Sequence, residues 1–147
     1  MKGAQNDFLK DARHIAIYGL KRSGKGFASD VTRELKRGIP AQLYAVHPQA
    51  AELSGWAAVT SAGQLQQPVD SALIMLKTAP ARQAIDDAAS AGIRSVWLVF
   101  EAASGGNLAY ARTKGLTAVE GCPLLFLPNA SSLHRFHQFL ARLFGRI

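Results

Sequence analysis

A glycine-rich, basic segment at residues 19–26 has the composition of a phosphate-binding loop. It reads Gly-Leu-Lys-Arg-Ser-Gly-Lys-Gly and directly follows the apolar stretch His14–Tyr18. Glycines let a phosphate approach the backbone closely, and the free amides at the start of a following helix can bind an anion. Lys21, Arg22 and Lys25 add positive charge. We therefore predict an anion site at this loop; a plain glycine-rich turn with solvated lysines is the alternative.

The loop departs from two phosphate-binding motifs. Its Gly-x-x-x-x-Gly-Lys spacing matches that of a nucleoside triphosphate loop, but Gly26 stands where Ser or Thr would hold magnesium. The loop is not Gly-x-Gly-x-x-Gly, and the next apolar stretch ends in Val46-His47-Pro48, without the acidic or basic residue that would read a dinucleotide ribose. A triphosphatase and a nicotinamide-dependent enzyme are therefore disfavoured.

The remaining reactive residue types define no catalytic or metal site. His134 and His137 have a metal-ligand spacing, but no third ligand lies near them in the sequence. Cys122 is expected to be a small buried residue, with a mixed disulfide to a thiol ligand as the alternative. Trp56 and Trp97 are expected in the core.

The acidic residues are equally uninformative about catalysis. Asp86 and Asp87 are consecutive on an expected helix and point in different directions, which favours a solvated face. Glu101 follows an apolar stretch, but one carboxylate does not define a reaction. We therefore predict no catalytic residue.

The elements expected to position the loop alternate between strand and helix. Five apolar stretches lack polar alternation, as do strands covered on both faces of a parallel sheet; they are residues 14–18, 42–46, 71–76, 95–100 and 116–119. Helical spacing separates several of them, and Gly38, Gly92 and Gly115 are expected to end three helices in the left-handed conformation. This alternation predicts a single α/β domain, a Rossmann-like doubly wound parallel sheet with flanking helices.

Other parts of the chain give weaker signals. Thr78 and Ser104 are candidate helix N-caps. Residues 49–69 are interrupted by Gly and Pro, and we expect a short helix, an extra strand near Trp56–Val59 and a loop there. Residues 1–12 are expected to form a helical extension, residues 13–128 the domain, and residues 129–147 an amphipathic helix. That last helix docks on the chain's own sheet or forms a homodimer.

Composition limits the class of protein. The 147 residues are 48% apolar and carry a net charge of +7, which is typical of one folded domain with an anionic partner. No apolar run approaches the ~18 residues of a membrane helix, so we expect a cytoplasmic protein without a membrane partner. The basic residues are spread along the whole chain, which disfavours nucleic acid as the partner.

A family resemblance is carried by five segments: AIYGLKRSGKGFASDVTRELKRG, YAVHP, SGWAAVTSAGQLQQPVDSALIML, AGIRSVWLVF and GLTAVEGCPLLFLP. Together they resemble the small stand-alone CoA-binding proteins, which are similar to the N-terminal CoA-binding domain of succinyl-CoA synthetase and related acyl-CoA synthetases. The resemblance covers roughly residues 13–128. Where family members commonly carry Gln or a Glu-Gly or Pro-Gly pair after the fourth strand, this chain reads Val99-Phe100-Glu101-Ala102.

The resemblance implies a coenzyme A or acyl-CoA site. The loop would bind the pyrophosphate, the end of the second strand would border the adenine, and the end of the third would face the rest of the nucleotide or the pantetheine arm. The implied residues are Gly19, Leu20, Lys21, Arg22, Ser23 and Lys25 in the loop, Val46, His47 and Pro48 after the second strand, and Lys77 and Thr78 after the third.

The expected function is binding of CoA or an acyl-CoA without a reaction of the chain's own. A complete ligase is not expected, because the related synthetases carry a phosphohistidine domain that this sequence lacks. The possibility that a partner chain supplies that domain stays open. Two alternatives remain. One is an enzyme acting on a nucleotide-like substrate at the same loop, with Glu101 or His47 as proton carrier. The other is a dimeric interaction protein with a vestigial pocket.

Overall fold

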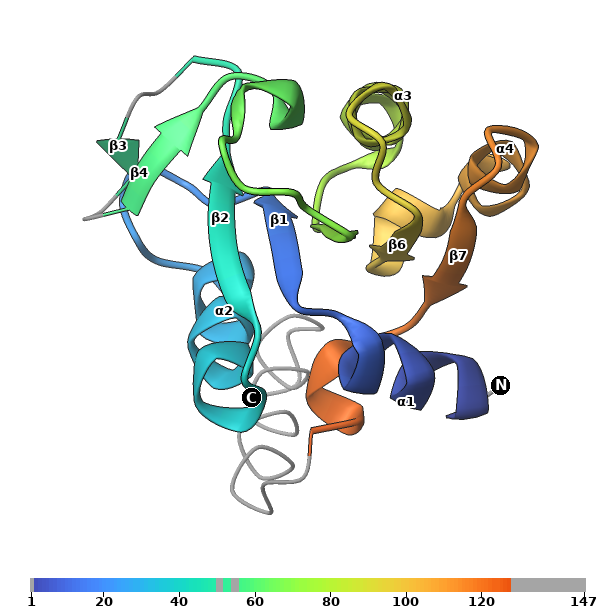
Figure 1. Ribbon diagram of the computed structural model, residues 1–147, viewed down its shortest axis with the longest axis horizontal. Helices are drawn as coiled ribbons and strands as arrows, with labels where there is room; N and C mark the ends of the chain where they lie inside the picture. The colour runs from blue at the N-terminus through green and yellow to red at the C-terminus, as the bar shows by residue number, and fades with distance from the viewer. Residues whose placement is uncertain (1, 50–51, 54–55, 128–147) are drawn as a thin grey trace, which may run out of the picture.

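The structure is a computed structural model that describes residues 2–49, 52–53 and 56–127. In this part of the chain, seven strands form one sheet with helices on both faces (Figure 1). The strands are β1 (His14–Tyr18), β2 (Gln42–Val46), β3 (Glu52–Leu53), β4 (Trp56–Val59), β5 (Ser71–Ile74), β6 (Ser95–Leu98) and β7 (Thr117–Glu120). The helices are α1 (Lys2–Asp11), α2 (Phe27–Gly38), α3 (Thr78–Ser90) and α4 (Asn107–Thr113), with 3-10 turns η1 (Ala62–Gln64), η2 (Phe100–Ala103) and η3 (Pro123–Leu125).

The sheet order is β3-β4-β2-β1-β5-β6-β7, and every pair is parallel except β3 with β4. From β1 the chain passes through α2 to β2 on one side, and it later returns to β5 on the other side of β1. The strand order therefore reverses between β1 and β5, and ligands of open α/β sheets bind outside the carboxyl ends of the strands at such a point. The predicted α/β, doubly wound fold is confirmed.

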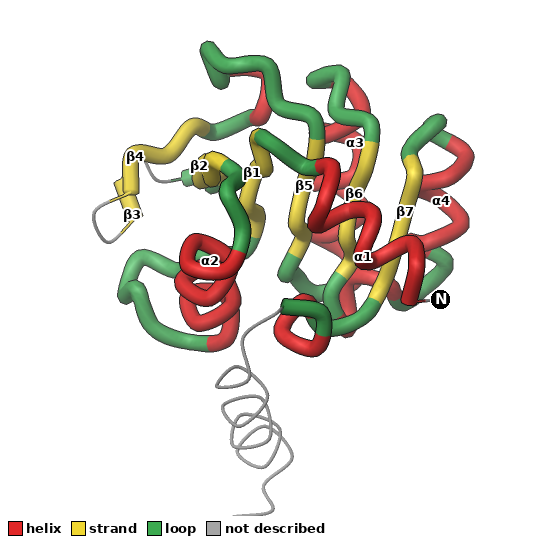
Figure 2. The backbone as a smooth tube through the Cα atoms, turned by 60° about the horizontal axis from the view of Figure 1, so that its bottom comes forward, coloured by secondary structure: helices red, strands yellow, loops and turns green. Residues whose placement is uncertain are grey.

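Two hydrophobic layers explain why the strands are uninterrupted apolar stretches. Ile15 and Ile17 of β1 enter the core beneath α1 and α2, whereas Ala16 and Tyr18 enter the core beneath α3. Figure 2 shows α1 lying across the strands of the β5 to β7 side, where Phe8 packs edge-on against Trp97 with ring centroids 5.3 Å apart. Residues on both faces of β1 are therefore buried, as the absence of polar alternation predicted.

The strand limits differ from the predicted ones mainly at the carboxyl ends. Strands β5 and β6 each end two residues earlier than predicted, and β7 is shifted by one residue. Beyond the two shortened strands, Met75 and Val99 remain in the hydrophobic layer beneath α2. Their apolar character therefore reflects packing of the loops, which sequence alone does not distinguish from a strand.

Two of the three predicted glycine caps are confirmed. Gly92 and Gly115 are left-handed, with φ of 82° and 84°. Gly38 is instead the last residue of α2, and the extended residue Ile39 follows it. The glycine was a poor predictor there because the chain leaves α2 directly into an extended segment.

The two predicted N-caps are also wrong. The N-cap of α3 is Lys77, and Thr78 is the first helical residue. The Thr78 hydroxyl donates to the carbonyl of Glu101 at 3.0 Å, so a tertiary contact occupies it. The N-cap of α4 is Gly106, in the left-handed conformation with φ of 80°, rather than Ser104.

Within the irregular segment predicted at residues 49–69, strands β3 and β4 form an added edge to the sheet. The predicted strand Trp56–Val59 is present as β4, which pairs in parallel with β2 and antiparallel with β3. In place of a short α-helix, the described part of this segment has the single 3-10 turn η1.

The predicted C-terminal amphipathic helix, with His134 and His137, falls on residues 129–147, which lie outside the described residues. Its role in dimerisation therefore stays a prediction. Among the helices that are described, none is both long enough and apolar enough to cross a membrane.

Candidate functional site

Residues 19–26 connect β1 to α2 at the carboxyl edge of the sheet, next to the point where strand order reverses. Gly19 has φ of 113°, and a Cβ at this position would lie 2.2 Å from the carbonyl oxygen of Met75. Only glycine therefore allows the loop to cross the end of β5 so closely. Gly26 is the N-cap of α2 and supplies no side chain to the helix amides. Uncapped helix amides can donate to an anion, and the anion site expected at this loop stays a prediction.

The loop is held by its own polar groups. The amide of Lys25 donates to the Ser23 hydroxyl at 3.2 Å, and the amide of Gly24 donates to the Lys21 carbonyl at 3.1 Å. The Arg22 guanidinium donates to the carbonyl of Gln49 at 3.0 Å, which ties the loop to the segment after β2. Lys21, Arg22 and Lys25 are all exposed. Ser23 thus shapes the turn, and the two lysines carry the positive charge of the loop into solvent.

The end of β2 lies beside this loop, because Tyr18 of β1 is paired with Val46. The backbone amide of His47 donates to the Val59 carbonyl at 2.9 Å. The ring atom Nδ1 of His47 accepts from the amide of Gln49 at 3.1 Å. An accepting Nδ1 places the proton of the neutral ring on Nε2. Pro48 is exposed. The backbone and the ring of His47 are thus both fixed at the edge of the site.

The end of β5 reaches the same edge from the other side of β1, with Tyr18 paired with Ile74. Lys77 is exposed there, and Thr78 is held against η2. All three groups of residues implied by the resemblance therefore lie at the carboxyl ends of the neighbouring strands β2, β1 and β5.

A buried amide that the sequence did not single out holds this edge together. Asn107 is fully buried, and its Nδ2 donates to the carbonyls of Thr78 and Ala102 at 2.9 and 3.0 Å. Its Oδ1 accepts from Nε of Arg82 at 2.9 Å. The amide joins the start of α3 to η2. No sequence signal marks it, because two of its three partners, the Thr78 carbonyl and Nε of Arg82, are distant in the chain.

The solvated face expected for Asp87 is wrong. Its carboxylate accepts hydrogen bonds from the Tyr18 hydroxyl at 2.7 Å, the Ser61 hydroxyl at 2.8 Å and the Ala62 amide at 2.9 Å. Burial, and then the contact with Asp87, raise the pKa of Tyr18 well above its ordinary value, so the phenol stays protonated as a donor. Asp87 therefore pins the segment after β4 to α3.

Asp86, its neighbour, lies nearer to solvent and has polar partners. Its carboxylate accepts from the Tyr110 hydroxyl at 2.5 Å and lies 3.4 Å from Nζ of Lys114. The contact with Tyr110 is the main cause that lowers the pKa of Asp86. The polar partners found for the two aspartates all lie outside residues 19–26.

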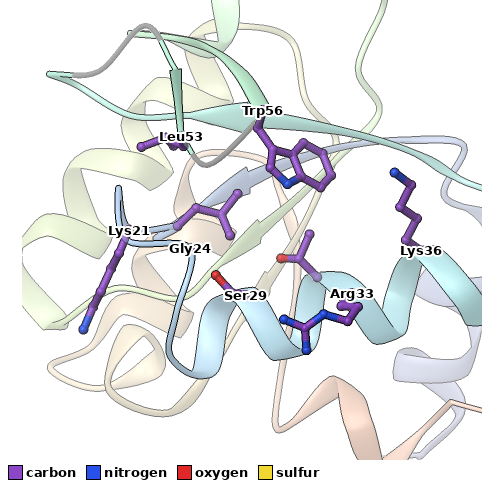
Figure 3. A pocket seen from close by; sticks show the side chains of 9 residues that line it. Lys21, Gly24, Ser29, Arg33, Lys36, Leu53 and Trp56 are labelled. Atoms are coloured by element: carbon purple, nitrogen blue, oxygen red, sulfur yellow. The ribbon is translucent and has the colours of Figure 1, made fainter.

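Two hollows flank the loop. The first, of about 270 Å³, lies between α2 and the β3–β4 pair. Figure 3 shows Trp56 facing Ser29 and Arg33 of α2, with Lys36 and Lys21 at opposite ends. Trp56 is thus half-buried rather than in the core, and Nζ of Lys36 lies 5.5 Å from its ring centroid. This hollow is cationic with one aromatic wall.

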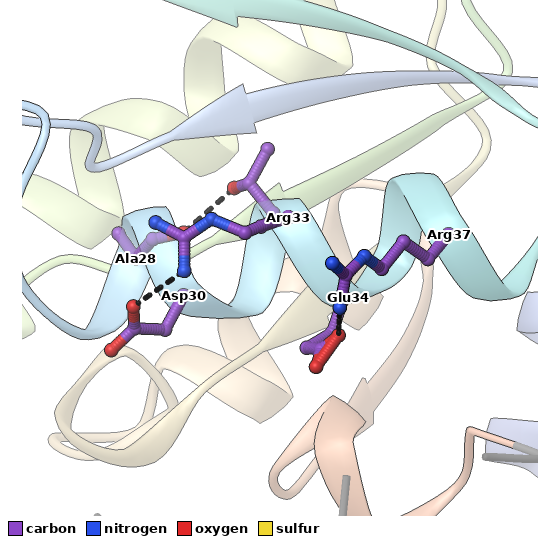
Figure 4. Close-up of polar contacts among 6 residues, drawn as sticks. Ala28, Asp30, Arg33, Glu34 and Arg37 are labelled. Carbon is purple, nitrogen blue, oxygen red and sulfur yellow. Dashed lines mark hydrogen bonds and ion pairs between the residues drawn. The ribbon is translucent and has the colours of Figure 1, made fainter. Parts of the chain in front are cut away.

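The guanidinium groups of α2 are engaged along the helix itself (Figure 4). Arg33 pairs with Asp30 at 3.1 Å, and Arg37 pairs with Glu34 at 3.7 Å. These pairs lower the net charge of the helix face, so Lys21 and Lys36 provide most of the charge of the first hollow.

The second hollow, of about 180 Å³, lies on the other side of the loop, over the ends of β5 and β6. Its walls are mostly apolar, and it is lined by Phe27, Met75, Leu76, Lys77, Val99, Phe100 and Glu101. The loop therefore separates a cationic hollow from an apolar one.

Cys122 and Trp97 are buried, as predicted. Burial raises the pKa of the Cys122 thiol to about 11, so very little thiolate is present near neutral pH. In the part of the chain that is described, no group of three or more His, Cys, Asp or Glu residues is arranged to hold a metal ion.

Comparison with known families decides the class of this domain. A family model described as CoA binding domain matches residues 13–128. The chain belongs to this CoA-binding family. A comparison with curated protein sequences found no significant match.

Solved structures share the fold of this CoA-binding domain. A protein redesigned for binding has a TM-score of 0.75 at 18% identity and covers 95% of this chain and 92% of its own. A Thermus thermophilus protein has a TM-score of 0.71 at 22% identity, covering 92% and 98%. An acetyl-coenzyme A synthetase 1 from Ca. Korarchaeum cryptofilum, described as dinucleotide forming, has a TM-score of 0.63 at 23% identity; the match covers 76% of this chain and 26% of that one.

Proposed function

We propose that this domain binds coenzyme A or an acyl-CoA at the loop of residues 19–26, without a reaction of its own. The observation that carries the proposal is the geometry of the loop. Gly19 brings the backbone across the end of β5, and α2 begins without a side-chain cap at the point where strand order reverses. A phosphate is the ligand that such a site favours.

Each part of the edge has a proposed role. The pyrophosphate lies against the loop amides from Gly19 to the start of α2, with Leu20 and Ser23 shaping the turn and Lys21, Arg22 and Lys25 supplying charge. The adenine lies beside Val46, His47 and Pro48 at the end of β2, and Lys77 and Thr78 face the rest of the nucleotide or the pantetheine arm. The membership of the CoA-binding family supports this assignment.

Calorimetric titration tests the ligand class. We expect CoA to bind with a dissociation constant in the micromolar range, roughly −8 kcal/mol, and NADH to bind much more weakly. The reason is that β2 ends in Val46-His47-Pro48, without the charged residue that reads a dinucleotide ribose. NADH binding as tight as that of CoA would contradict the proposal.

A homodimer through residues 129–147 is a second proposal about this domain. The stripe formed by Leu133, Phe136, Leu140, Leu143 and Phe144 has helical spacing, and symmetric dimers are the commonest assemblies. Sedimentation of the full chain and of a chain cut after Pro128 should show a dimer that becomes a folded monomer. A monomer from both chains refutes the dimer, and unfolding on truncation would show that the segment belongs to the core.

A further inference from the structure

Phe100 combines two unfavourable features at the edge of the site. Among the described residues it is the one non-glycine residue with positive φ, at 52°, and its large apolar side chain is 40% exposed. A bulky residue in this conformation costs free energy and persists only where the surrounding structure enforces it. Such outliers cluster at ligand sites, which makes Phe100 a candidate for ligand contact.

The ring of Phe100 is paired with a second ring from the loop. The ring centroids of Phe27 and Phe100 lie 5.2 Å apart with an angle of 31° between the planes. Phe27 is the first residue of α2 and follows Gly26 directly, so one end of the loop carries this aromatic partner. The two rings thus join the loop to η2.

The hollow beside this pair is small and apolar. Met75, Leu76 and Val99 complete its walls, and its volume is about 180 Å³. Pockets for drug-sized ligands measure about 300–1,000 Å³, so this hollow accepts only the end of a ligand. The charged side chains of Lys77 and Glu101 also border it, which leaves a polar path toward the strand ends.

The hollow borders both ends of the loop. At one end Gly19 packs on Met75, whose carbonyl would lie 2.2 Å from an added Cβ, and at the other end Phe27 follows Gly26. On the opposite side of the loop lie Lys21 and Lys36. A ligand that binds across the loop therefore meets positive charge on one side and an apolar surface on the other.

We infer that the Phe27–Phe100 pair receives a small aliphatic acyl group carried on the sulfur of CoA, so that the domain selects an acyl thioester over free CoA. This inference rests on the proposed function, because the phosphates must bind at the loop for the sulfur end to reach the hollow. A free thiol buries little apolar area there. Each methylene added to the acyl group gains up to about fourfold in affinity when it is fully buried.

The experiment titrates the full chain with CoA, acetyl-CoA and butyryl-CoA. We expect affinity to rise from CoA to acetyl-CoA and several-fold further to butyryl-CoA. In Phe100→Gly the ratio of butyryl-CoA to CoA affinity should fall several-fold toward one, because the hollow loses one of its two aromatic walls. Glycine relieves the strain of positive φ, which offsets part of the ring packing that is lost with Phe27, so the variant should stay folded and its melting temperature is measured beside the titration.

Two further variants separate recognition from folding. Phe100→Leu keeps an apolar wall and should retain most of the ratio. Leu125→Ala removes the other large apolar side chain that is exposed in the described residues, at 50%, and should leave the ratio unchanged. Equal affinity of the parent chain for CoA and both thioesters would overturn the inference, as would a ratio that survives in Phe100→Gly. If none of the three ligands binds, the proposed function itself is wrong.

Discussion

Replacing Lys25 by alanine is expected to weaken CoA binding by about 1–3 kcal/mol, roughly a 5- to 150-fold loss of affinity. Lys25 is exposed at the end of the loop, two residues before α2 begins. Its ammonium group can therefore contact a phosphate that lies on the helix amides. The hydrogen bond of residue 25 to Ser23 uses the backbone amide, so alanine preserves the turn. Calorimetric titration with CoA measures the loss.

The control for this variant is Lys10→Ala, which removes the same charge from an exposed position on α1. It should leave CoA affinity within about twofold, because charges beyond a Debye length of about 10 Å are screened at 0.1 M salt. The melting temperature of Lys25→Ala without ligand should barely change. A marked loss of stability would make Lys25 a structural residue. If Lys25→Ala and Lys10→Ala weaken CoA binding equally, the loss reflects net charge and not a contact of Lys25 with the phosphate.

Replacing Asn107 by alanine is expected to lower the free energy of unfolding by about 3 kcal/mol. The change leaves the carbonyls of Thr78 and Ala102, and Nε of Arg82, without the partner they now share. Each buried polar group left unpaired costs about 1–3 kcal/mol, less where water reaches it. Urea denaturation of the parent chain and the variant measures the difference.

Ser104→Ala is the matched control, three residues earlier in the chain. Ser104 is exposed, and no side chain caps α4, so this substitution should change stability by less than about 0.5 kcal/mol. If Asn107→Ala is equally mild, water has replaced the amide and the start of α3 is held by other contacts. If Ser104→Ala is the more damaging, the hydroxyl acts as the cap that the sequence predicted.

Local sequence determined the strands and the loop between them. The stretch His14–Tyr18 lacks polar alternation because both faces of β1 are buried from Ile15 onward. Gln42–Val46 has the same apolar pattern although only Ala45 and Val46 of β2 are buried. Gly92 and Gly115 mark helix ends because a left-handed residue is required there, which is a property of single positions. The loop of residues 19–26 could be recognised for the same reason, since its glycines and lysines are adjacent in the chain. That it binds CoA stays a prediction.

Tertiary structure alone decided which polar residues hold the site. The sequence did not single out Asn107, and it favoured a solvated face for Asp87. Apart from the contact of Asn107 with Ala102, both side chains form hydrogen bonds with groups 25 or more residues away. The left-handed Phe100 could not be foreseen either, because its propensity opposes that conformation and the ring that it packs against, Phe27, is distant in the sequence. Patterns along a chain report burial and local backbone conformation. Partners brought together by the sheet crossovers leave no such pattern, so these contacts are visible only in the folded domain.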